Sequence, residues 1–306
     1  MIVKLDLPRG MRDVQYEELR NISFIRDKFV ETAEIFDFNQ IEPSTLELLS
    51  TLEAKSGPSI IQATYSFTDK GGRDIALRFD LTIGLSRFVS MRRDLKLPAK
   101  LSSFGGVWRY DEPQHGRYRY FHQWDVEIFG SPDVDADAEV IDFVSSFLSK
   151  LKIDFVILIN HRSILEEYLS KYLGITDNSV ISEMMRAIDK LSKKSSEQII
   201  NEYAGKLDSI KLQEFIKFVS VTDRPDKILD NDKLMEFKSS GNLWELIDSL
   251  KSRRVKNMMV DFRIVRGLDY YSGLVFEAKE LSSQVGSLVG GGRYDKLTEA
   301  FGRKDL

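Results

Sequence analysis

Apolar residues recur every three to four positions in several stretches of the chain, which is the spacing of amphipathic helices. Residues 16–36 form the first such stretch and residues 82–91 a second. A third, 133–151, opens with acidic residues, which favour a helix N-terminus. A fourth helix is predicted over residues 294–300, after a run of glycines.

Alternating or continuous apolar runs predict the strands. Residues 39–43 predict a short strand ending in a proline, with Ser44 as the N-cap of a following helix. Residues 65–80 predict a hairpin that turns at 69–72, and residues 154–160 an apolar strand. Three more strands are predicted further along: 257–262, 273–278 and 285–291.

Residues 161–252 differ from the rest of the chain. They are rich in Lys, Glu, Ser and Leu at helical spacing, with almost no strand pattern. This predicts a helical insertion between 1–160 and 253–306, the two parts of one core domain. The order of elements is typical of an α+β fold, with an antiparallel sheet flanked by helices.

Composition excludes several classes of protein. The chain has 306 residues, 42% hydrophobic and 30% charged, which is enough for two ordinary globular domains. No run of 18 apolar residues and no signal-peptide pattern is present. Cysteine is absent, which excludes thiolate catalysis and cysteine-ligated zinc, and only three histidines argue against a multi-histidine metal site. We expect a cytoplasmic protein without a metal site of its own.

Charge is uneven along the chain. The net charge is −4, yet residues 86–119 carry eight Lys or Arg against three acids, and residues 125–142 carry seven acids and no base. A local basic surface on an acidic protein suits a localised anion, such as a nucleotide or one end of an RNA. The alternative is a chance cluster of solvated charges.

Residues 104–130 are the most informative stretch. Two aromatic, alternating segments flank a loop at 111–116, which predicts a long antiparallel hairpin. A hairpin with fixed guanidinium groups and carboxylates is suited to binding a zwitterion next to a polyphosphate. The simpler alternative is an amphipathic hairpin whose charges are solvated. Alternation places three side chains on one face: Gln123, Asp125 and Glu127. Three arginines lie on or beside the turn: Arg109, Arg117 and Arg119.

Three other segments carry candidate binding residues. Residues 77–82 predict a strand that ends in Asp80 and Thr82, which suit an ammonium group and a helix cap, although both could be plain N-cap residues. Residues 265–273 place Arg266 beside a glycine, a combination that suits phosphate charge. The tyrosines that follow could equally pack in a sheet. Residues 290–295 are glycine-rich, which is a weak signal alone.

In this order, the four segments resemble the catalytic core of histidyl-tRNA synthetase, a class II aminoacyl-tRNA synthetase. PRGMRDV at residues 8–14 is similar to the family's N-terminal segment, and residues 37–43 to class II motif 1, which lies at a dimer interface in the family. Residues 104–130 are similar to motif 2 with its loop. RGLDYYSG and GGRYD are similar to the histidine-specific segments. The resemblance implies a class II synthetase-like sheet with a helical insertion domain.

The resemblance assigns roles to individual residues. Arg109 and Arg266 match catalytic arginines on the ATP α-phosphate, and Arg266 also matches a contact to the substrate carboxylate. Asp111 matches a position near the adenine, and Arg117 one on the γ-phosphate side. The remaining matches hold histidine, by its α-amino group or its side chain: Asp80, Thr82, Gln123, Glu127, Tyr270, Tyr271 and Tyr294.

The implied reaction is adenylation of histidine by ATP, with Mg²⁺ on the phosphates, followed by transfer to tRNA(His) by a homodimeric enzyme. Attack by an ionised carboxylate needs no general base. The helical insertion is expected either to contact the tRNA acceptor arm or to be a plain stabilising cap. Its candidate RNA contacts are Lys193, Lys194, Arg253 and Arg254.

Two departures from the family pattern keep alternatives open. The sequence stops at Leu306 before a motif 3 or an anticodon-binding domain, and Arg303 is not in the context of the motif 3 arginine. An incomplete, weakly active or inactive fragment is therefore one alternative. A second is the synthetase-like regulatory subunit of ATP phosphoribosyltransferase, which binds histidine without aminoacylation. A third is a non-catalytic tRNA-sensing domain. The enzyme is favoured over the regulatory subunit because the sequence contains Arg109, Arg117, Gln123 and Glu127. The intact RGLDYY argues against the tRNA-sensing domain.

Overall fold

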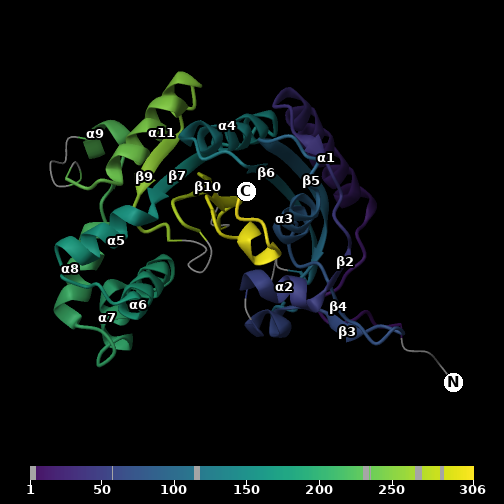
Figure 1. Cartoon of the computed structure of the whole chain (residues 1–306), viewed down its shortest axis with the longest axis horizontal. Coiled ribbons are helices and arrows are strands. Elements are labelled where there is room, and N and C mark those ends of the chain that lie inside the picture. Colours follow the sequence, from purple (N-terminus) through teal and green to yellow (C-terminus); the bar gives the residue numbers. More distant parts are fainter. Residues whose placement is uncertain are drawn as a thin grey trace. The chain divides into compact units, whose positions relative to one another are not determined.

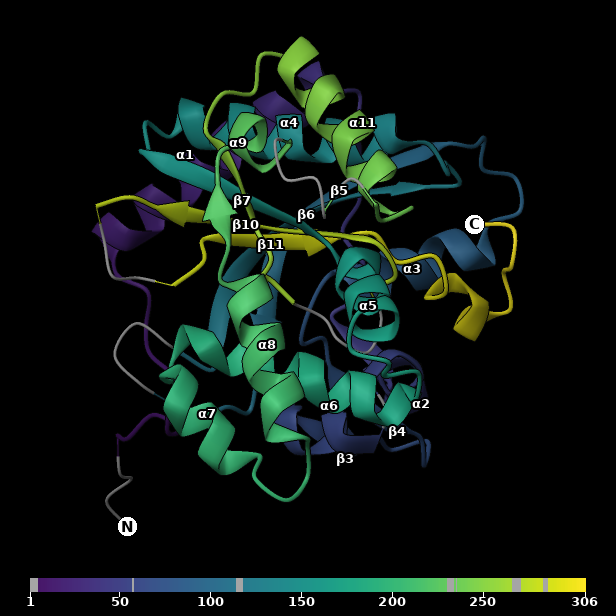
Figure 2. The same ribbon diagram turned by 90° about the vertical axis from the view of Figure 1, so that its left-hand side faces the viewer.

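The computed structural model describes residues 5–56, 58–113, 118–229, 234, 236–265, 271–282 and 286–306 (Figures 1 and 2). The chain divides into two compact units. The first comprises Met1–Ser131 and Lys296–Leu306, and the second comprises Pro132–Asp295. Within the described residues, no helix is long and apolar enough to cross a membrane.

The first unit combines a long helix with two small sheets. Its elements are α1 (Tyr16–Ile35), β1 (Asn39–Gln40), β2 (Leu46–Leu48), α2 (Leu49–Ser56), η1 (Pro58–Ala63), β3 (Ser66–Thr68), β4 (Asp74–Leu77), α3 (Thr82–Met91), β5 (Ala99–Trp108), β6 (Tyr120–Phe129) and η3 (Thr298–Phe301).

The predicted long hairpin is confirmed as β5 and β6, which pair antiparallel over their full lengths. The sheet order is β1-β5-β6, with β1 parallel to β5. Helix α1 covers one face, where the Phe29 ring lies 5.9 Å from Phe104 and 5.8 Å from Trp124. Phe29 is fully buried, so this aromatic cluster anchors α1 on the hairpin.

The predicted hairpin at 65–80 is also confirmed. Strands β3 and β4 pair antiparallel, and β2 adds to the other side of β4. The Asp69 carboxylate accepts backbone hydrogen bonds from Gly71 and Arg73, which closes the turn. One face of this sheet packs on a core formed by Leu52, Ile60, Ala76 and Ile83.

The second unit is a five-stranded sheet with helices. Its elements are α4 (Val134–Lys150), β7 (Phe155–His161), α5 (Arg162–Lys171), α6 (Asn178–Asp189), η2 (Lys190–Ser192), α7 (Ser196–Glu202), α8 (Ser209–Val219), β8 (Thr222–Asp223), α9 (Pro225–Leu229), α11 (Ser240–Ser252), β9 (Met258–Asp261), β10 (Leu274–Glu280) and β11 (Val289–Gly292).

The strand order in this sheet is β11-β10-β7-β9-β8. Strands β7 and β9 are parallel, whereas the other neighbours are antiparallel. The α+β fold predicted from sequence is confirmed. Two of the three sheets that the structure describes are mixed, because β1 and β5 pair parallel in one and β7 and β9 in the other. The region predicted as a helical insertion contains α5 to α11 and the short strand β8. The predicted boundaries at 160 and 252 stay a prediction.

Two local predictions were wrong. Ser44 does not cap a helix, because strand β2 follows it and its hydroxyl donates to the Leu46 carbonyl. The helix predicted over 294–300 is only the 3₁₀ turn η3, Thr298–Phe301. Apolar spacing over so few residues does not distinguish an α-helix from a single 3₁₀ turn.

Candidate active site

The face of β6 that carries Gln123, Asp125 and Glu127 is the centre of the candidate site in the first unit. The register pairs Gln123 with Gly105 and Glu127 with Leu101, so the predicted alternation is present. Glu127 is only 8% exposed, whereas Gln123 and Asp125 are half-buried. The Glu127 carboxylate therefore lies in a poorly hydrated environment, where a charged group needs hydrogen-bonding or ionic partners.

Arg109, at the end of β5, connects this face to the segment before α3. Its Nε donates to the Phe79 carbonyl at 3.0 Å, and Nη2 donates to Gln123 Oε1 at 3.3 Å. The guanidinium also lies 5.0 Å from the centroid of the Phe121 ring. These contacts fix the plane of the guanidinium group.

Asp80 and Thr82 lie at the start of α3 and make different contacts. Asp80 is buried, and its Oδ1 accepts a 3.1 Å hydrogen bond from the Ile83 amide, which is a helix-capping contact. Thr82 Oγ1 instead donates to Asp125 Oδ2 on β6 at 2.7 Å. The Thr82 hydroxyl therefore ties α3 to the hairpin.

Arg78 joins three segments of the first unit, and the sequence patterns did not single it out. It is buried, and it donates to the Gly106 carbonyl at 2.8 Å and to the Pro43 carbonyl at 2.6 Å. A Cβ on Gly105 would lie 2.6 Å from the Arg78 guanidinium. A side chain at position 105 of β5 would therefore clash with Arg78. The paired glycines of FGGVW, which lie between bulky residues of the strand, are the signal that could have revealed this close approach.

Arg119 contacts other residues of the hairpin loop and its flanks. Its Nε donates to the Asp111 carbonyl at 3.0 Å, and its guanidinium lies 4.0 Å from the centroid of the Tyr110 ring. Asp111, whose carbonyl accepts this hydrogen bond, is half-buried. Next to it, Glu112 forms an exposed ion pair with Arg9 at 2.7 Å.

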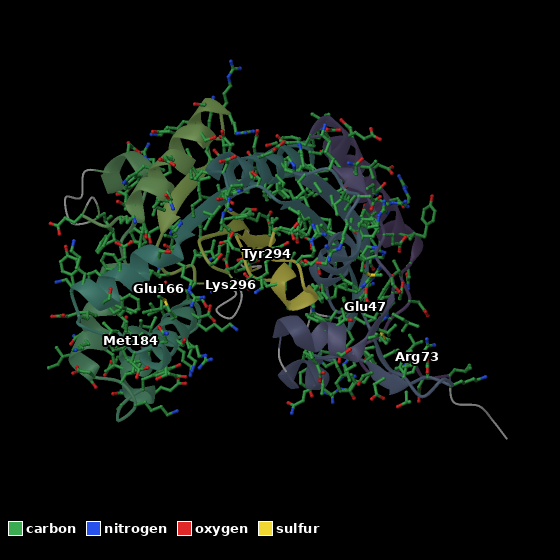
Figure 3. The ribbon with its side chains drawn as sticks, viewed as in Figure 1. Glu47, Arg73, Glu166, Met184, Tyr294 and Lys296 are labelled. Carbon is green, nitrogen blue, oxygen red and sulfur yellow. The ribbon has the colours of Figure 1, made fainter. Side chains whose placement is uncertain are left out.

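Tyr271 and Tyr294 come together in the second unit. Their ring centroids are 6.4 Å apart, at an interplanar angle of 36°, and both rings are half-buried (Tyr294 is labelled in Figure 3). A Cβ on Gly292 would lie 2.5 Å from the Leu274 carbonyl oxygen and 2.9 Å from the Tyr271 ring. The glycines of β11 thus make room for the protein's own backbone and rings.

Three of the predicted site residues, Arg117, Arg266 and Tyr270, lie outside the described residues. Among the residues that the structure does describe, no cluster of three or more His, Asp or Glu side chains could hold a metal ion. Arg303 is a structural residue, because its Nη1 donates to the Val89 and Arg92 carbonyls at the end of α3.

The same fold occurs in solved structures of synthetases. A histidyl-tRNA synthetase from Nostoc sp. PCC 7120 has a TM-score of 0.85 and 25% identity, covering 98% of this chain and 71% of that one. An ATP phosphoribosyltransferase regulatory subunit/histidyl-tRNA synthetase from Bacillus halodurans also has a TM-score of 0.85, at 24% identity, over 99% of this chain and 79% of that one. The fold is therefore that of a class II aminoacyl-tRNA synthetase.

Sequence comparison narrows the class to one family. The family model described as "Histidyl-tRNA synthetase" matches residues 10–306. The histidine–tRNA ligase of Pyrococcus furiosus is 37% identical over 97% of this chain and 70% of that protein. That of Thermoplasma volcanium is 34% identical over 99% of this chain and 71% of that protein. The chain belongs to the histidyl-tRNA synthetase family, and the resemblance found in its motifs is confirmed.

Proposed function

We propose that this chain catalyses the reaction of a histidine–tRNA ligase, in which ATP activates histidine to histidyl-adenylate and the histidyl group passes to tRNA(His). The observation that carries the proposal is the contact between Arg109 and Gln123, in a chain of this family. It places a cation suited to a phosphate next to an amide suited to an amino acid.

The activation step joins the histidine carboxylate to the α-phosphorus and expels pyrophosphate. The carboxylate is already ionised, so the step depends on alignment and on neutralising phosphate charge. Arg109 is held by the Phe79 carbonyl and Gln123, so its planar donors are oriented in advance. We assign Arg266 to the opposite side of the α-phosphate, Arg117 to the γ-phosphate side and Asp111 to the adenine side.

Recognition of histidine requires polar partners for its ammonium group and its imidazole. We assign the ammonium group to Asp80 and Thr82, which lie together at the start of α3. Gln123 and the buried Glu127 hold the amino acid from the hairpin. We assign the side-chain pocket to Tyr270 and to the neighbouring rings of Tyr271 and Tyr294. A site of this kind strongly rejects analogues that lack the imidazole nitrogens.

We further propose that Mg²⁺ arrives with ATP, bound to the β- and γ-phosphates, whose oxygens are the hard ligands it prefers. The described carboxylates form no cluster that would hold the ion by itself. The ion would neutralise phosphate charge beyond the reach of Arg109. We propose the cytoplasm as the location, because the substrate is tRNA.

A homodimer is the assembly we propose, and an apolar sheet face supports it. Paired residues of an antiparallel sheet share a face, so the register places Leu46, Leu48, Phe67 and Ile75 together. Leu46 is 43%, Leu48 49% and Phe67 51% exposed. A contiguous apolar face of this kind marks an interaction surface. Size-exclusion chromatography with light scattering distinguishes a dimer from a monomer, and Phe67→Glu should shift a dimer toward monomer.

The proposed ligase activity is tested by charging tRNA(His) with labelled histidine in the presence of ATP. The proposal predicts acid-precipitable label on tRNA(His) and none on a tRNA of another specificity. A chain that binds histidine by calorimetry but forms neither adenylate nor charged tRNA would support the regulatory-subunit alternative. The relatives of 34–37% identity favour the ligase, because they carry that name.

A further inference from the structure

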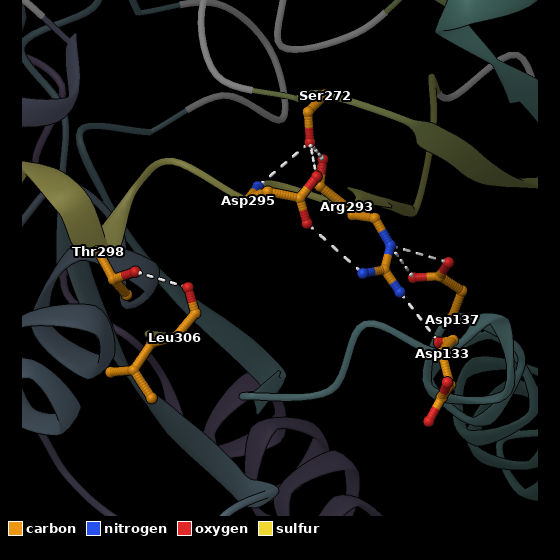
Figure 4. A network of polar contacts seen from close by, with 7 residues as sticks. All are labelled: Asp133, Asp137, Ser272, Arg293, Asp295, Thr298 and Leu306. Carbon is orange, nitrogen blue, oxygen red and sulfur yellow. Dashed lines mark hydrogen bonds and ion pairs between the residues drawn. The ribbon is translucent and has the colours of Figure 1, made fainter. Parts of the chain in front are cut away.

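Arg293 is the centre of a polar network in the second unit (Figure 4). Its Nε donates to both carboxylate oxygens of Asp137, at 3.2 and 3.1 Å. Its Nη2 donates to the Asp133 carbonyl at 3.0 Å, and Nη1 lies 3.5 Å from an Asp295 oxygen. The guanidinium thus connects the end of β11 to the beginning of α4.

The ion pair with Asp137 is shielded from water. The side chains are 18% exposed for Arg293 and 16% for Asp137. Burial raises the pKa of Asp137 to about 6, although the charge of Arg293 acts in the opposite direction. Loss of either partner would leave a charge in a site that hydrates it poorly, so the pair fixes its two segments firmly.

The network includes the chain neighbours of both tyrosines. Arg293 and Asp295 flank Tyr294, and Ser272 follows Tyr271. The Ser272 amide donates to the Arg293 carbonyl at 2.9 Å, and the Asp295 amide donates to Ser272 Oγ at 3.2 Å. The Ser272 hydroxyl also donates to the Asp295 carboxylate. The backbones that carry the two rings are therefore linked to each other and, through Arg293, to α4.

We propose that Arg293 is a positioning residue for histidine: anchored by Asp137, it holds Tyr271 and Tyr294 at the separation that the imidazole requires. The inference rests on the proposed function and adds a residue to which no binding role has been given. The guanidinium donors already engage Asp137 and the Asp133 carbonyl, so a substrate phosphate would have to displace these partners. Arg293 therefore acts through the tyrosines.

The test is a kinetic comparison of Arg293→Gln, Arg293→Lys and Asp137→Asn in histidine-dependent ATP–pyrophosphate exchange. Arg263→Gln is the matched control, because Arg263 also pairs with a buried carboxylate, Asp261, but within a single turn. We expect Arg293→Gln and Asp137→Asn to raise the KM for histidine about 10-fold or more, with the KM for ATP changed less than about 2-fold. Arg293→Lys should give an intermediate KM for histidine, because lysine keeps the positive charge but lacks the planar set of guanidinium donors.

A purely structural role would change the KM values for histidine and ATP together, or change neither. It would also lower the melting temperature, as we expect for Arg263→Gln. If Arg293→Gln fails to fold, Arg293→Lys and Asp137→Asn carry the same test. An unchanged KM for histidine in the folded variants would overturn the inference while leaving the proposed function intact. A wild-type chain without histidine-dependent exchange would instead remove the proposed function, and this inference with it.

Discussion

Arg109 donates a 3.3 Å hydrogen bond from Nη2 to Gln123 Oε1, across the two strands of one hairpin. Arg109 is the residue we assign to the α-phosphate, and Gln123 is assigned to the amino acid. The reacting carboxylate and the phosphorus must meet between two such groups. If these assignments hold, the position of one substrate depends on the side chain that orients the other.

Replacing Arg109 with lysine should remove most of the activation rate. Lysine keeps the charge but cannot donate to the Phe79 carbonyl, Gln123 and a phosphate from one fixed plane. We expect kcat for pyrophosphate exchange to fall by about 100-fold or more. Arg92→Lys is the control, because Arg92 forms an exposed pair with Asp94 and should retain full activity. Equal rates for the two variants would contradict the role of Arg109.

Thr82→Val tests the connection between α3 and the hairpin. The substitution removes the 2.7 Å hydrogen bond to Asp125 at nearly constant volume. We expect a loss of about 1 kcal/mol in stability and a several-fold higher KM for histidine. Thr68→Val is the matched control, since Thr68 donates to Asp74 in an exposed hairpin. Urea unfolding and exchange kinetics on both variants measure the difference. An equal rise in the KM for histidine in Thr68→Val would count against a specific role of the bond between Thr82 and Asp125.

Gly292→Ala should disturb the tyrosine pair. Its Cβ would lie 2.5 Å from the Leu274 carbonyl oxygen, so the backbone of β10 or β11 must shift. We expect a destabilisation of about 1–3 kcal/mol, as for overpacking, and weaker histidine binding. Gly241→Ala in α11 is the control, because nothing lies within 4 Å of that position and alanine favours a helix. Calorimetric titration with histidine would show no difference between the two variants if the glycine were dispensable.

Two buried groups should give opposite pH dependences of stability. Burial, with the nearby charge of Arg293, lowers the pKa of His161 to about 4. The unfolded chain therefore takes up the His161 proton first, and acidification from pH 7 to 4 costs on the order of 2–3 kcal/mol through this group. The pKa of Asp137 is raised to about 6, so the folded state takes up that proton first. Acidification then adds stability of similar size through Asp137.

Urea midpoints measured between pH 7 and 4 separate the two contributions. His161→Gln should make the protein lose less stability on acidification than the wild type, and Asp137→Asn should make it lose more. Superimposable pH profiles for the wild type and both variants would mean that neither pKa is shifted on folding.

The parts of this fold that depend on local periodicity could be predicted from the sequence. The hairpin of β5 and β6 follows from two alternating segments around a polar loop, and α3 was predicted at its observed bounds, Thr82–Met91. The contacts of Arg78 and the bond between Thr82 and Asp125 could not be predicted. They join residues 28, 35 and 43 positions apart, which only tertiary structure brings together. The segment after Ser44 became a strand because pairing with β4 outweighed its helical signal.

The most direct test of the account is the amino-acid dependence of ATP–pyrophosphate exchange by the wild-type chain. The account predicts exchange with histidine and background rates with each of the other amino acids, because any other side chain would leave the polar groups that we assign to the imidazole without partners. Exchange with a different amino acid, or with none at saturating ATP and Mg²⁺, would contradict it.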